Sequence, residues 1–258
     1  MAVIFDGRTQ ANIILDRLTA EVAAMTRKPK LVSILVGQDP ASAMYVNLKK
    51  KKGEQIGAEV EVIKLDKSSS IGIIEVIRKI NVDAEVDGIM VQLPLPFGPA
   101  ETDQVLAAID PRKDVDGMRL DSSFIAPVVL ACLHVLKTAP LKVKPLKVAV
   151  VGAGGFVGQR LCQTLTREGH QVIKVTEGEL NNQVLQDCDV AISATGQPNL
   201  IKAEMVKEGV VAIDCGAPMP EFDEGVYQKA NFYTPVPGGI GPLTVAYLLS
   251  NLVKASLG

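Results

Sequence analysis

The chain has 258 residues, and its hydrophobic share of 47% is enough for a sizeable core in one large or two modest domains. The formal net charge is −2, so no basic excess points to nucleic acid or a membrane surface as the main partner. The first residues show no charged segment before an apolar run, and no stretch of about 18 uncharged apolar residues occurs. We therefore expect a cytoplasmic protein without a signal peptide or a membrane span.

Cysteine and histidine usage points away from disulfides and metals. No two cysteines have Cys-x-x-Cys spacing, so we expect reduced core thiols. Neither histidine has an acidic or cysteine partner at ligand spacing, so we expect no metal site. The residues concerned are Cys132, Cys162, Cys188, Cys215, His134 and His170.

The first half of the chain alternates helical and strand patterns. Apolar residues at helical spacing predict a helix over residues 10–25. Asp39 is suited to cap a second helix, and Pro40 suits its first position. The remaining patterns predict strands over residues 30–36, 59–65 and 86–92, and helices over residues 71–81 and 102–109.

Tyr45 and Lys49 lie four residues apart in the helix that begins at Pro40, so they share one face, with Ser42 one turn before Tyr45. The tyrosine ring offers a flat stacking surface, and a desolvated lysine beside other cations, here residues 50–52, has a lowered pKa suited to proton transfer. The alternative is a solvated, lysine-rich helix face, which is what a run of charges usually forms. The residues alone favour that alternative.

Two further segments carry polar groups at predicted strand or loop ends. Gln92 ends an apolar strand that runs into prolines, and ligands of open α/β sheets gather at such ends, although a lone glutamine there is otherwise an ordinary hydrogen-bonding group. Asp114 and Asp116 precede Gly117 in a loop. They are suited to bind a ligand or simply to form a turn.

In the second half, a helix over residues 128–136 and a linker over residues 140–145 precede an apolar strand over residues 147–151. That strand ends in the glycines of Gly152-Ala153-Gly154 and Gly158, and a helix follows over residues 159–168. Strand, glycine turn and helix together favour a dinucleotide site, because backbone amides and the helix N-terminus attract a pyrophosphate. The alternative is a tight turn without a ligand, since the spacing is one residue longer than the usual fingerprint.

Three more strands are predicted over residues 171–175, 189–194 and 210–214, and a helix begins at Pro242. An acid after the first of these strands, such as Glu177, stands where a ribose hydroxyl is usually held; it is otherwise a solvated loop acid. The ends of the other two strands, with Thr195, Gly196 and Ala217, are expected to line the nicotinamide side. Alternating strands and helices predict an α/β fold of two domains, one of them a Rossmann-like, doubly wound parallel sheet.

Four long motifs resemble the bifunctional methylenetetrahydrofolate dehydrogenase/methenyltetrahydrofolate cyclohydrolase family, along nearly the whole chain. The first is Asp-Pro-Ala-Ser-x-x-Tyr-x-x-x-Lys-x-Lys, which begins at Asp39. The others are Asp87-Gly-Ile-Met-Val-Gln-Leu-Pro-Leu-Pro96, Pro111-x-Lys-Asp-Val-Asp-Gly117 and Thr234-Pro-Val-Pro-Gly-Gly-Ile-Gly-Pro-Leu-Thr244. Together they are far more specific than the glycine turn.

The resemblance implies a role for each motif. Lys49 is the implied catalytic lysine, supported by Gln92, while Tyr45 stacks on the folate and Asp116 holds its pterin ring. Further implied folate contacts are Ser42, Pro237, Gly238 and Gly239, and the implied dinucleotide contacts are Gly152, Ala153, Gly154, Gly158, Glu177, Thr195, Gly196 and Ala217.

The resemblance also implies how the chain divides. Residues 1–139 form the folate-binding catalytic domain, which a C-terminal helix over residues 241–258 completes, and residues 140–240 form the dinucleotide domain, with a cleft between the two. A homodimer is implied as well. A Tyr-x-x-x-Lys pair also occurs in short-chain dehydrogenases, but there it follows the glycine turn, whereas Tyr45 and Lys49 precede Gly152. The order therefore argues against the short-chain interpretation.

Four segments depart from the family's usual pattern. Gly152-Ala153-Gly154 replaces Gly-Arg-Ser, and Glu177-Gly178 replaces a Ser-Arg pair. Both changes remove positive charge that a 2′-phosphate would meet, so NAD becomes plausible where the resemblance alone implies NADP. In addition, Gly216-Ala217-Pro218 replaces Gly-Ile-Asn, and Ala126-Pro127-Val128-Val129 replaces Pro-Cys-Thr-Pro. The alternatives are a monofunctional dehydrogenase or cyclohydrolase, or a non-catalytic folate- or nucleotide-binding paralogue.

Overall fold

The computed structural model describes residues 2–66, 68–141, 145–176 and 178–258. They form two compact α/β units, and neither unit is a continuous stretch of chain. The six-stranded unit comprises Met1–Ala11 and Val128–Thr244, and the three-stranded unit comprises Asn12–Pro127 and Val245–Gly258. The chain therefore passes between the units three times.

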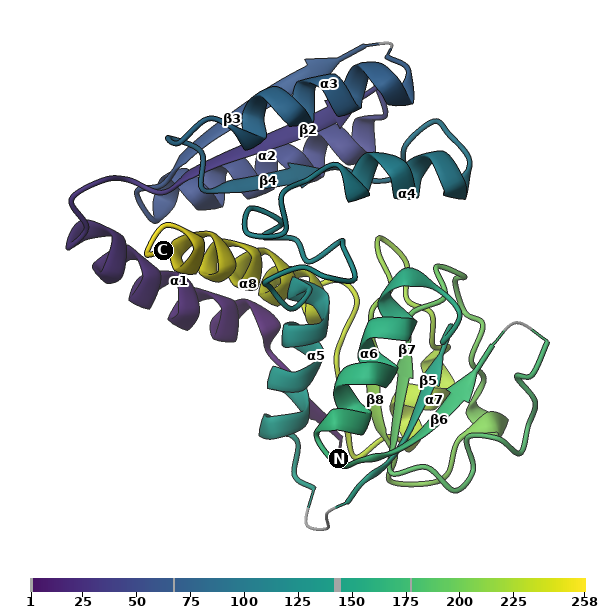
Figure 1. Ribbon diagram of the computed structural model, residues 1–258. Coiled ribbons are helices and arrows are strands. Elements are labelled where there is room, and N and C mark those ends of the chain that lie inside the picture. Colours follow the sequence, from purple (N-terminus) through teal and green to yellow (C-terminus); the bar gives the residue numbers. More distant parts are fainter. Residues whose placement is uncertain (1, 67, 142–144, 177) are drawn as a thin grey trace. The chain divides into compact units, whose positions relative to one another are not determined.

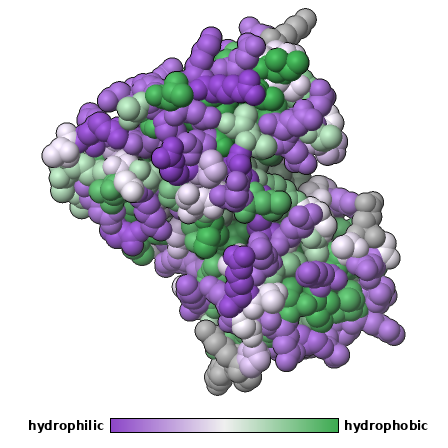
Figure 2. Space-filling view, in the orientation of Figure 1, coloured by the Kyte–Doolittle hydropathy of each residue, from purple (hydrophilic) through white to green (hydrophobic). Residues whose placement is uncertain are grey.

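The three-stranded unit is a small parallel sheet with helices on both faces (Figure 1). Its strand order is β3 (Glu59–Leu65), β2 (Lys30–Val36), β4 (Gly88–Val91). Alternate residues of β2 and β4, such as Ile34 and Ile89, pack with α3 (Ser70–Asn81) and α4 (Pro99–Ala107) on one face. The opposite face carries α2 (Pro40–Gln55). The outward surface of the α3 and α4 layer is mostly hydrophilic (Figure 2).

The C-terminal part of α8 (Ile240–Ala255) completes the core on the α2 face. Leu252 packs so closely on Gly88 that a Cβ there would lie 2.9 Å from its Cδ1. Asn251 is buried, and its Nδ2 donates to the carbonyls of Val115 at 2.9 Å and Ile125 at 3.0 Å. Two loop carbonyls of this unit are therefore satisfied by the last helix of the chain.

The six-stranded unit is a wholly parallel sheet. Its strand order is β1 (Val3–Ile4), β9 (Phe232–Tyr233), β8 (Val211–Asp214), β7 (Val190–Ser193), β5 (Lys147–Val151), β6 (Gln171–Val175). Helix α6 (Phe156–Arg167) packs on β5 and β6, while the 3₁₀ helix η1 (Ala203–Met205) and α7 (Glu224–Lys229) belong to the cluster around Phe222 on the sheet's other face. The remaining helices are α1 (Gly7–Ala23) and α5 (Pro127–Thr138).

The predicted fold class is confirmed: the chain is a two-domain α/β protein with a Rossmann-like parallel sheet. Strands β2, β3 and β6 have the predicted bounds. Helix α6 begins at Phe156, three residues before the predicted start, because Gly155 serves as its N-cap without a side chain to mark it. Gly169 follows that helix with φ +85°, as expected of a glycine after a helix end.

The division into units falls at residues 11/12, 127/128 and 244/245. The predicted boundaries were at residues 139/140 and 240/241, and the functional assignment of the two domains stays a prediction. Among the described residues, no helix is both long and apolar enough to cross a membrane.

Candidate functional site

The helix that carries Lys49 is positioned at its first turn. Asp39 is the N-cap of α2, and its Oδ2 accepts the Ser42 amide at 2.7 Å, while Pro40 takes the first position. This start places Tyr45 and Lys49 one turn apart, as the sequence predicts, and Ser42 is buried one turn earlier. The Lys49 Nζ lies 4.7 Å from the centre of the Tyr45 ring.

Lys49 is the centre of a small cluster, the Lys49 cluster, made by Tyr45, Lys49, Met90, Gln92 and Asp116. Only 6% of the lysine is exposed. Its Nζ donates to Met90 Sδ at 3.1 Å and to Gln92 Oε1 at 3.2 Å. Gln92 Nε2 donates to the Leu93 carbonyl at 2.7 Å, which turns the Gln92 oxygen toward the lysine. The solvated alternative for Lys49 is therefore wrong.

Burial lowers the pKa of Lys49, and the charge of Asp116 offsets part of that shift. The neighbouring lysines at residues 50–52, which the sequence predicts to lower this pKa, are not the cause. Lys50 pairs with Glu54 at 3.8 Å instead, and Lys51 is exposed. Burial, with the charge of Asp116, raises the pKa of Tyr45 to about 12, so its phenol stays protonated near neutral pH. A poorly solvated amine next to a protonated phenol and a carboxylate is suited to move a proton.

The two loop aspartates divide the roles that the sequence left open. Asp114 is buried and accepts the amides of Met118 at 3.0 Å and Arg119 at 2.8 Å, so it forms the turn. Asp116 is half-buried, and its charge acts on both Tyr45 and Lys49. Asp116 is thus the aspartate available to a ligand at the Lys49 cluster.

The Gly152 turn, residues 152–155, follows β5 and is shaped by glycines. Gly152 has φ +86°, and a Cβ there would lie 2.4 Å from the Ala194 carbonyl oxygen. A Cβ on Gly158 would lie 2.1 Å from the Gly152 carbonyl oxygen, so α6 packs tightly under the turn. A Cβ on Gly154 would come no closer than 3.9 Å to the Thr176 Cγ2, which leaves open space over the turn. The residues therefore fit a dinucleotide pyrophosphate.

The backbone donors for such a ligand lie at the start of α6, not at the first two residues of the Gly152 turn. The amides of Gly152 and Ala153 donate to the Val175 carbonyl, at 2.9 and 3.1 Å. Gly155 caps α6 without a side chain, so the first amides of that helix have no side-chain partner at the cap. Amides at a helix N-terminus favour negative charge. Gly154 is exposed above them.

The strand ends next to this turn are held by two buried acids that the sequence analysis missed. Glu221 accepts the amides of Thr195 and Gly196, at 2.7 and 2.8 Å. Asp214 accepts the amides of Gly216 and Glu221, at 2.8 and 2.9 Å. Nothing local marks either acid as buried; their only signal is that they end β8 or closely follow it. Ala217 itself is exposed.

Pro237, Gly238 and Gly239 lie between β9 and α8 in the six-stranded unit. Gly238 has φ +115°, and Gly239 is so close to Gly7 that a Cβ on Gly7 would lie 1.9 Å from its oxygen. These glycines are needed for the backbone path. Their contact with folate stays a prediction.

Comparison with known proteins decides the family. A family model described as "Tetrahydrofolate dehydrogenase/cyclohydrolase, catalytic domain" matches residues 5–116, and its "NAD(P)-binding domain" counterpart matches residues 127–257. The chain belongs to the tetrahydrofolate dehydrogenase/cyclohydrolase family. The resemblance stated from the four motifs is confirmed.

Individual relatives cover nearly the full chain. The "Bifunctional protein FolD" of Aquifex aeolicus is 37% identical over 99% of this chain and 95% of its own length. The bifunctional FolD enzyme of Campylobacter jejuni has a TM-score of 0.92 at 30% identity, over 100% of this chain and 99% of that one. The Trypanosoma brucei FolD, solved with NADP and an inhibitor, has a TM-score of 0.90 at 28% identity, over 99% of this chain and 98% of that one.

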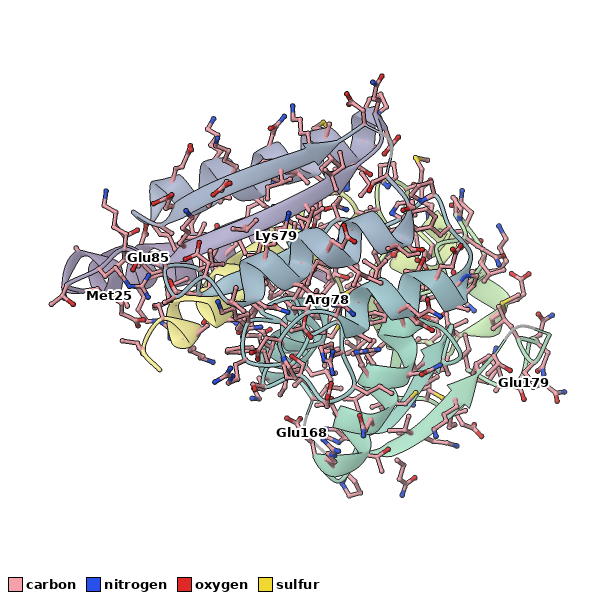
Figure 3. All side chains as sticks on the ribbon, turned by 45° about the horizontal axis from the view of Figure 1, so that its top comes forward. Met25, Arg78, Lys79, Glu85, Glu168 and Glu179 are labelled. Carbon is pink, nitrogen blue, oxygen red and sulfur yellow. The ribbon has the colours of Figure 1, made fainter. Side chains whose placement is uncertain are left out.

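Two acids, Glu177 and Glu179, follow β6 in the sequence. Glu177 lies outside the described residues. Glu179 lies in the same loop (Figure 3), and its Oε2 accepts the Thr176 amide at 2.8 Å and the Thr176 hydroxyl at 2.5 Å. These hydrogen bonds lower the pKa of Glu179, so a negative charge is fixed close to the end of β6.

A pair of thiols that was not predicted from the sequence lies close in the chain to two of the segments that differ from the family pattern, residues 126–129 and 216–218. Cys132 on α5 and Cys215 after β8 are free thiols whose sulfurs lie 3.5 Å apart. The hydrogen bond with Cys132, together with burial, raises the pKa of Cys215 well above its ordinary value. The Cys215 thiol therefore stays protonated near neutral pH.

Proposed function

We propose that this family member oxidises 5,10-methylenetetrahydrofolate to the methenyl form with a nicotinamide dinucleotide and then hydrolyses it to 10-formyltetrahydrofolate. The observation that carries the proposal is the buried, weakly partnered Lys49 in a chain that also has the glycine turn of a dinucleotide domain. A bound nicotinamide would accept the hydride. The chain's own residues would position the folate and handle the proton.

In the hydrolytic step, water attacks the methenyl carbon and loses one proton. The bond from that carbon to N5 then breaks as the hydroxyl proton passes to N5, which leaves the formyl group on N10. The neutral amine of Lys49 is the group proposed to accept the proton that the attacking water loses, because burial lowers its pKa and Gln92 Oε1 orients it. Asp116 would bind the pterin ring, and the Tyr45 ring would stack on it. Gly152, Ala153, Gly154 and Gly158 would hold the pyrophosphate, and Thr195, Gly196 and Ala217 would border the nicotinamide.

The ring of Tyr45, and not its hydroxyl, is expected to bind folate. Tyr45→Phe keeps the stacking surface, so the folate Kd should change less than about threefold, whereas Tyr45→Ala should weaken binding about 5- to 100-fold. Calorimetric titration with a folate analogue measures both values. Met44→Ala, at an exposed neighbouring residue of the same helix, is the control. Equal losses in the Phe and Ala variants would instead assign binding to the hydroxyl.

We further propose that NAD is preferred to NADP. The segments that carry arginine in the family read Gly152-Ala153-Gly154 and Glu177-Gly178 here, and Glu179 adds a fixed carboxylate to the same loop. An acid after the second strand of such a sheet suits a ribose 2′-hydroxyl and repels a 2′-phosphate.

Oxidation of methylenetetrahydrofolate, followed spectroscopically with NAD and NADP in parallel, tests the function and the preference together. We expect kcat/KM to favour NAD by at least about tenfold. This ratio corresponds to about 1.4 kcal/mol, the size of one charge repulsion between the acid and the 2′-phosphate. Glu177→Arg should shift the ratio toward NADP, whereas Glu168→Arg, an equal charge change at an exposed residue, should not. A wild-type preference for NADP would refute the role of Glu177 but keep the function.

If neither dinucleotide supports turnover, an assay of methenyl hydrolysis is the next step. Hydrolysis would then identify a monofunctional cyclohydrolase, and its absence would identify a binding protein. The cytoplasmic location and the homodimer stay predictions.

A further inference from the structure

Glu221 is a buried acid whose carboxyl group is used entirely inside the six-stranded unit. It is 2% exposed. Its Oε2 accepts the Ser193 hydroxyl at 2.5 Å and the Thr195 amide and hydroxyl at 2.7 Å each, and its Oε1 accepts the Gly196 amide at 2.8 Å. Four donors to one buried carboxyl group hold that group and its partners in a single arrangement.

The backbone of Glu221 is itself held in place by Asp214. Asp214, at the end of β8, accepts the Glu221 amide at 2.9 Å, the Phe222 amide at 3.2 Å and the Tyr227 hydroxyl at 2.8 Å. The Asp214 amide donates to the Thr234 hydroxyl at 2.7 Å, and both of these residues are fully buried. Glu221 therefore connects a rigid strand end to the turn that follows β7.

That turn, the Thr195 turn of residues 195–196, lies directly against the Gly152 turn. The Ala194 carbonyl and the Thr195 Cγ2 are the atoms that a Cβ on Gly152 would meet, at 2.4 and 3.2 Å. Because both amides of the Thr195 turn donate to Glu221, they are not presented to a ligand. The turn contributes a surface of fixed position beside the pyrophosphate site.

We propose that Glu221 is a positioning residue for dinucleotide binding: it holds the Thr195 turn against the Gly152 turn and thereby sets the affinity for the dinucleotide. This inference rests on the proposed function, because it takes the Gly152 turn to be the dinucleotide site. A merely structural role of Glu221 would stabilise the whole unit without a specific effect on the dinucleotide.

The test compares three variants of the full chain with the wild type. Glu221→Gln keeps the size of the side chain but places an amide donor among four donors. Ser193→Ala removes one of the four hydrogen bonds at a fully buried residue. Glu224→Gln makes the same change as the first variant at an exposed residue three positions away. Each variant is assayed for the Kd of NAD and of NADP, the KM and kcat of oxidation, methenyl hydrolysis and thermal melting.

We expect Glu221→Gln to weaken binding of the preferred dinucleotide at least about tenfold and Ser193→Ala about threefold, from the loss of hydrogen bonds to a charged group. The loss should fall on KM more than on kcat. Hydrolysis should stay within about twofold of the wild type in all variants, because Lys49 lies in the other unit. Glu224→Gln should behave as the wild type.

Wild-type dinucleotide affinity in both Glu221→Gln and Ser193→Ala would overturn the inference. So would parallel loss of dinucleotide binding, hydrolysis and melting temperature, which indicates general destabilisation. If Glu221→Gln does not fold, the threefold change in Ser193→Ala decides. A wild-type protein that binds neither dinucleotide would refute the proposed dehydrogenase function itself, which is a different result from any of these.

Discussion

Lys49→Met should reduce hydrolysis of methenyltetrahydrofolate by about 100- to 10,000-fold, the range that a positioned general acid or base contributes. Methionine fills nearly the same volume as the lysine stem, next to Met90 and Tyr45, but carries no proton-accepting group. A steady-state assay that follows the absorbance of the methenyl substrate measures the loss of hydrolytic activity. Lys51→Met, an exposed lysine on the same helix, should keep full activity.

The same substitution should not destabilise the fold. Lys49 is 6% exposed, and its hydrogen-bond partners among the described residues are a thioether and one amide oxygen, so its charge is costly to bury. We expect the melting temperature of Lys49→Met to equal or exceed that of the wild type near neutral pH. A well-folded variant with full hydrolytic activity would remove Lys49 from the mechanism.

The pH dependence of Lys49 has a defined sign. Its pKa is lowered from an ordinary value of 10.5, so the amine becomes neutral at a lower pH than a solvated lysine. Hydrolysis should therefore rise with pH, with a midpoint below 10.5. Between the folded pKa and 10.5 the unfolded chain binds the extra proton, so wild-type stability rises with pH there, and the stability advantage of Lys49→Met shrinks. Denaturant titrations at several pH values measure this difference.

Gly152→Ala should weaken dinucleotide binding, with a Kd raised at least about 100-fold. The substitution places a Cβ 2.4 Å from the Ala194 oxygen at a residue with φ +86°, so the Gly152 turn or the strand end must move. The left-handed backbone alone costs about 1–2 kcal/mol for a residue with a side chain. Dinucleotide titration and thermal melting measure the two effects.

A matched variant separates strain from the clash. Gly169→Ala imposes the same left-handed cost, at φ +85°, but its Cβ meets no atom within 4 Å. It should lower the melting temperature without changing the dinucleotide Kd. If Gly152→Ala binds the dinucleotide as tightly as Gly169→Ala does, the glycine turn is not the site.

Much of this structure could be predicted from local pattern. Apolar runs gave β2, β3 and β6 their bounds, and helical spacing brought Tyr45 and Lys49 to one face. Short elements escaped prediction: β1 and β9 have two residues each, and pairing with a neighbouring strand defines them more than their own sequence does. Helix α7 and η1 were missed for the same reason of length.

Burial was the property that local pattern did not reveal. The residues alone favoured a solvated Lys49, although the packing of α2 on the sheet encloses it. Asp114 and Asp116 stand in one loop, yet only the tertiary fold decides which of them forms the turn. Glu221 was unnoticed because an acid after prolines is usually a surface residue. Each of these roles depends on neighbours distant in the chain.

The packing of the C-terminal part of α8 in the three-stranded unit has a consequence for folding during synthesis of the protein. Leu252 and Asn251 close a core whose strands are made far earlier, since β2 begins at residue 30. While the ribosome is still making the six-stranded unit, Gly88 lacks its cover and the carbonyls of Val115 and Ile125 lack their donor. The Lys49 cluster rests on that same sheet face. Most of the three-stranded unit is therefore translated first, but its core is completed last. N-terminal domains usually fold as they emerge from the ribosome, and this unit departs from that order.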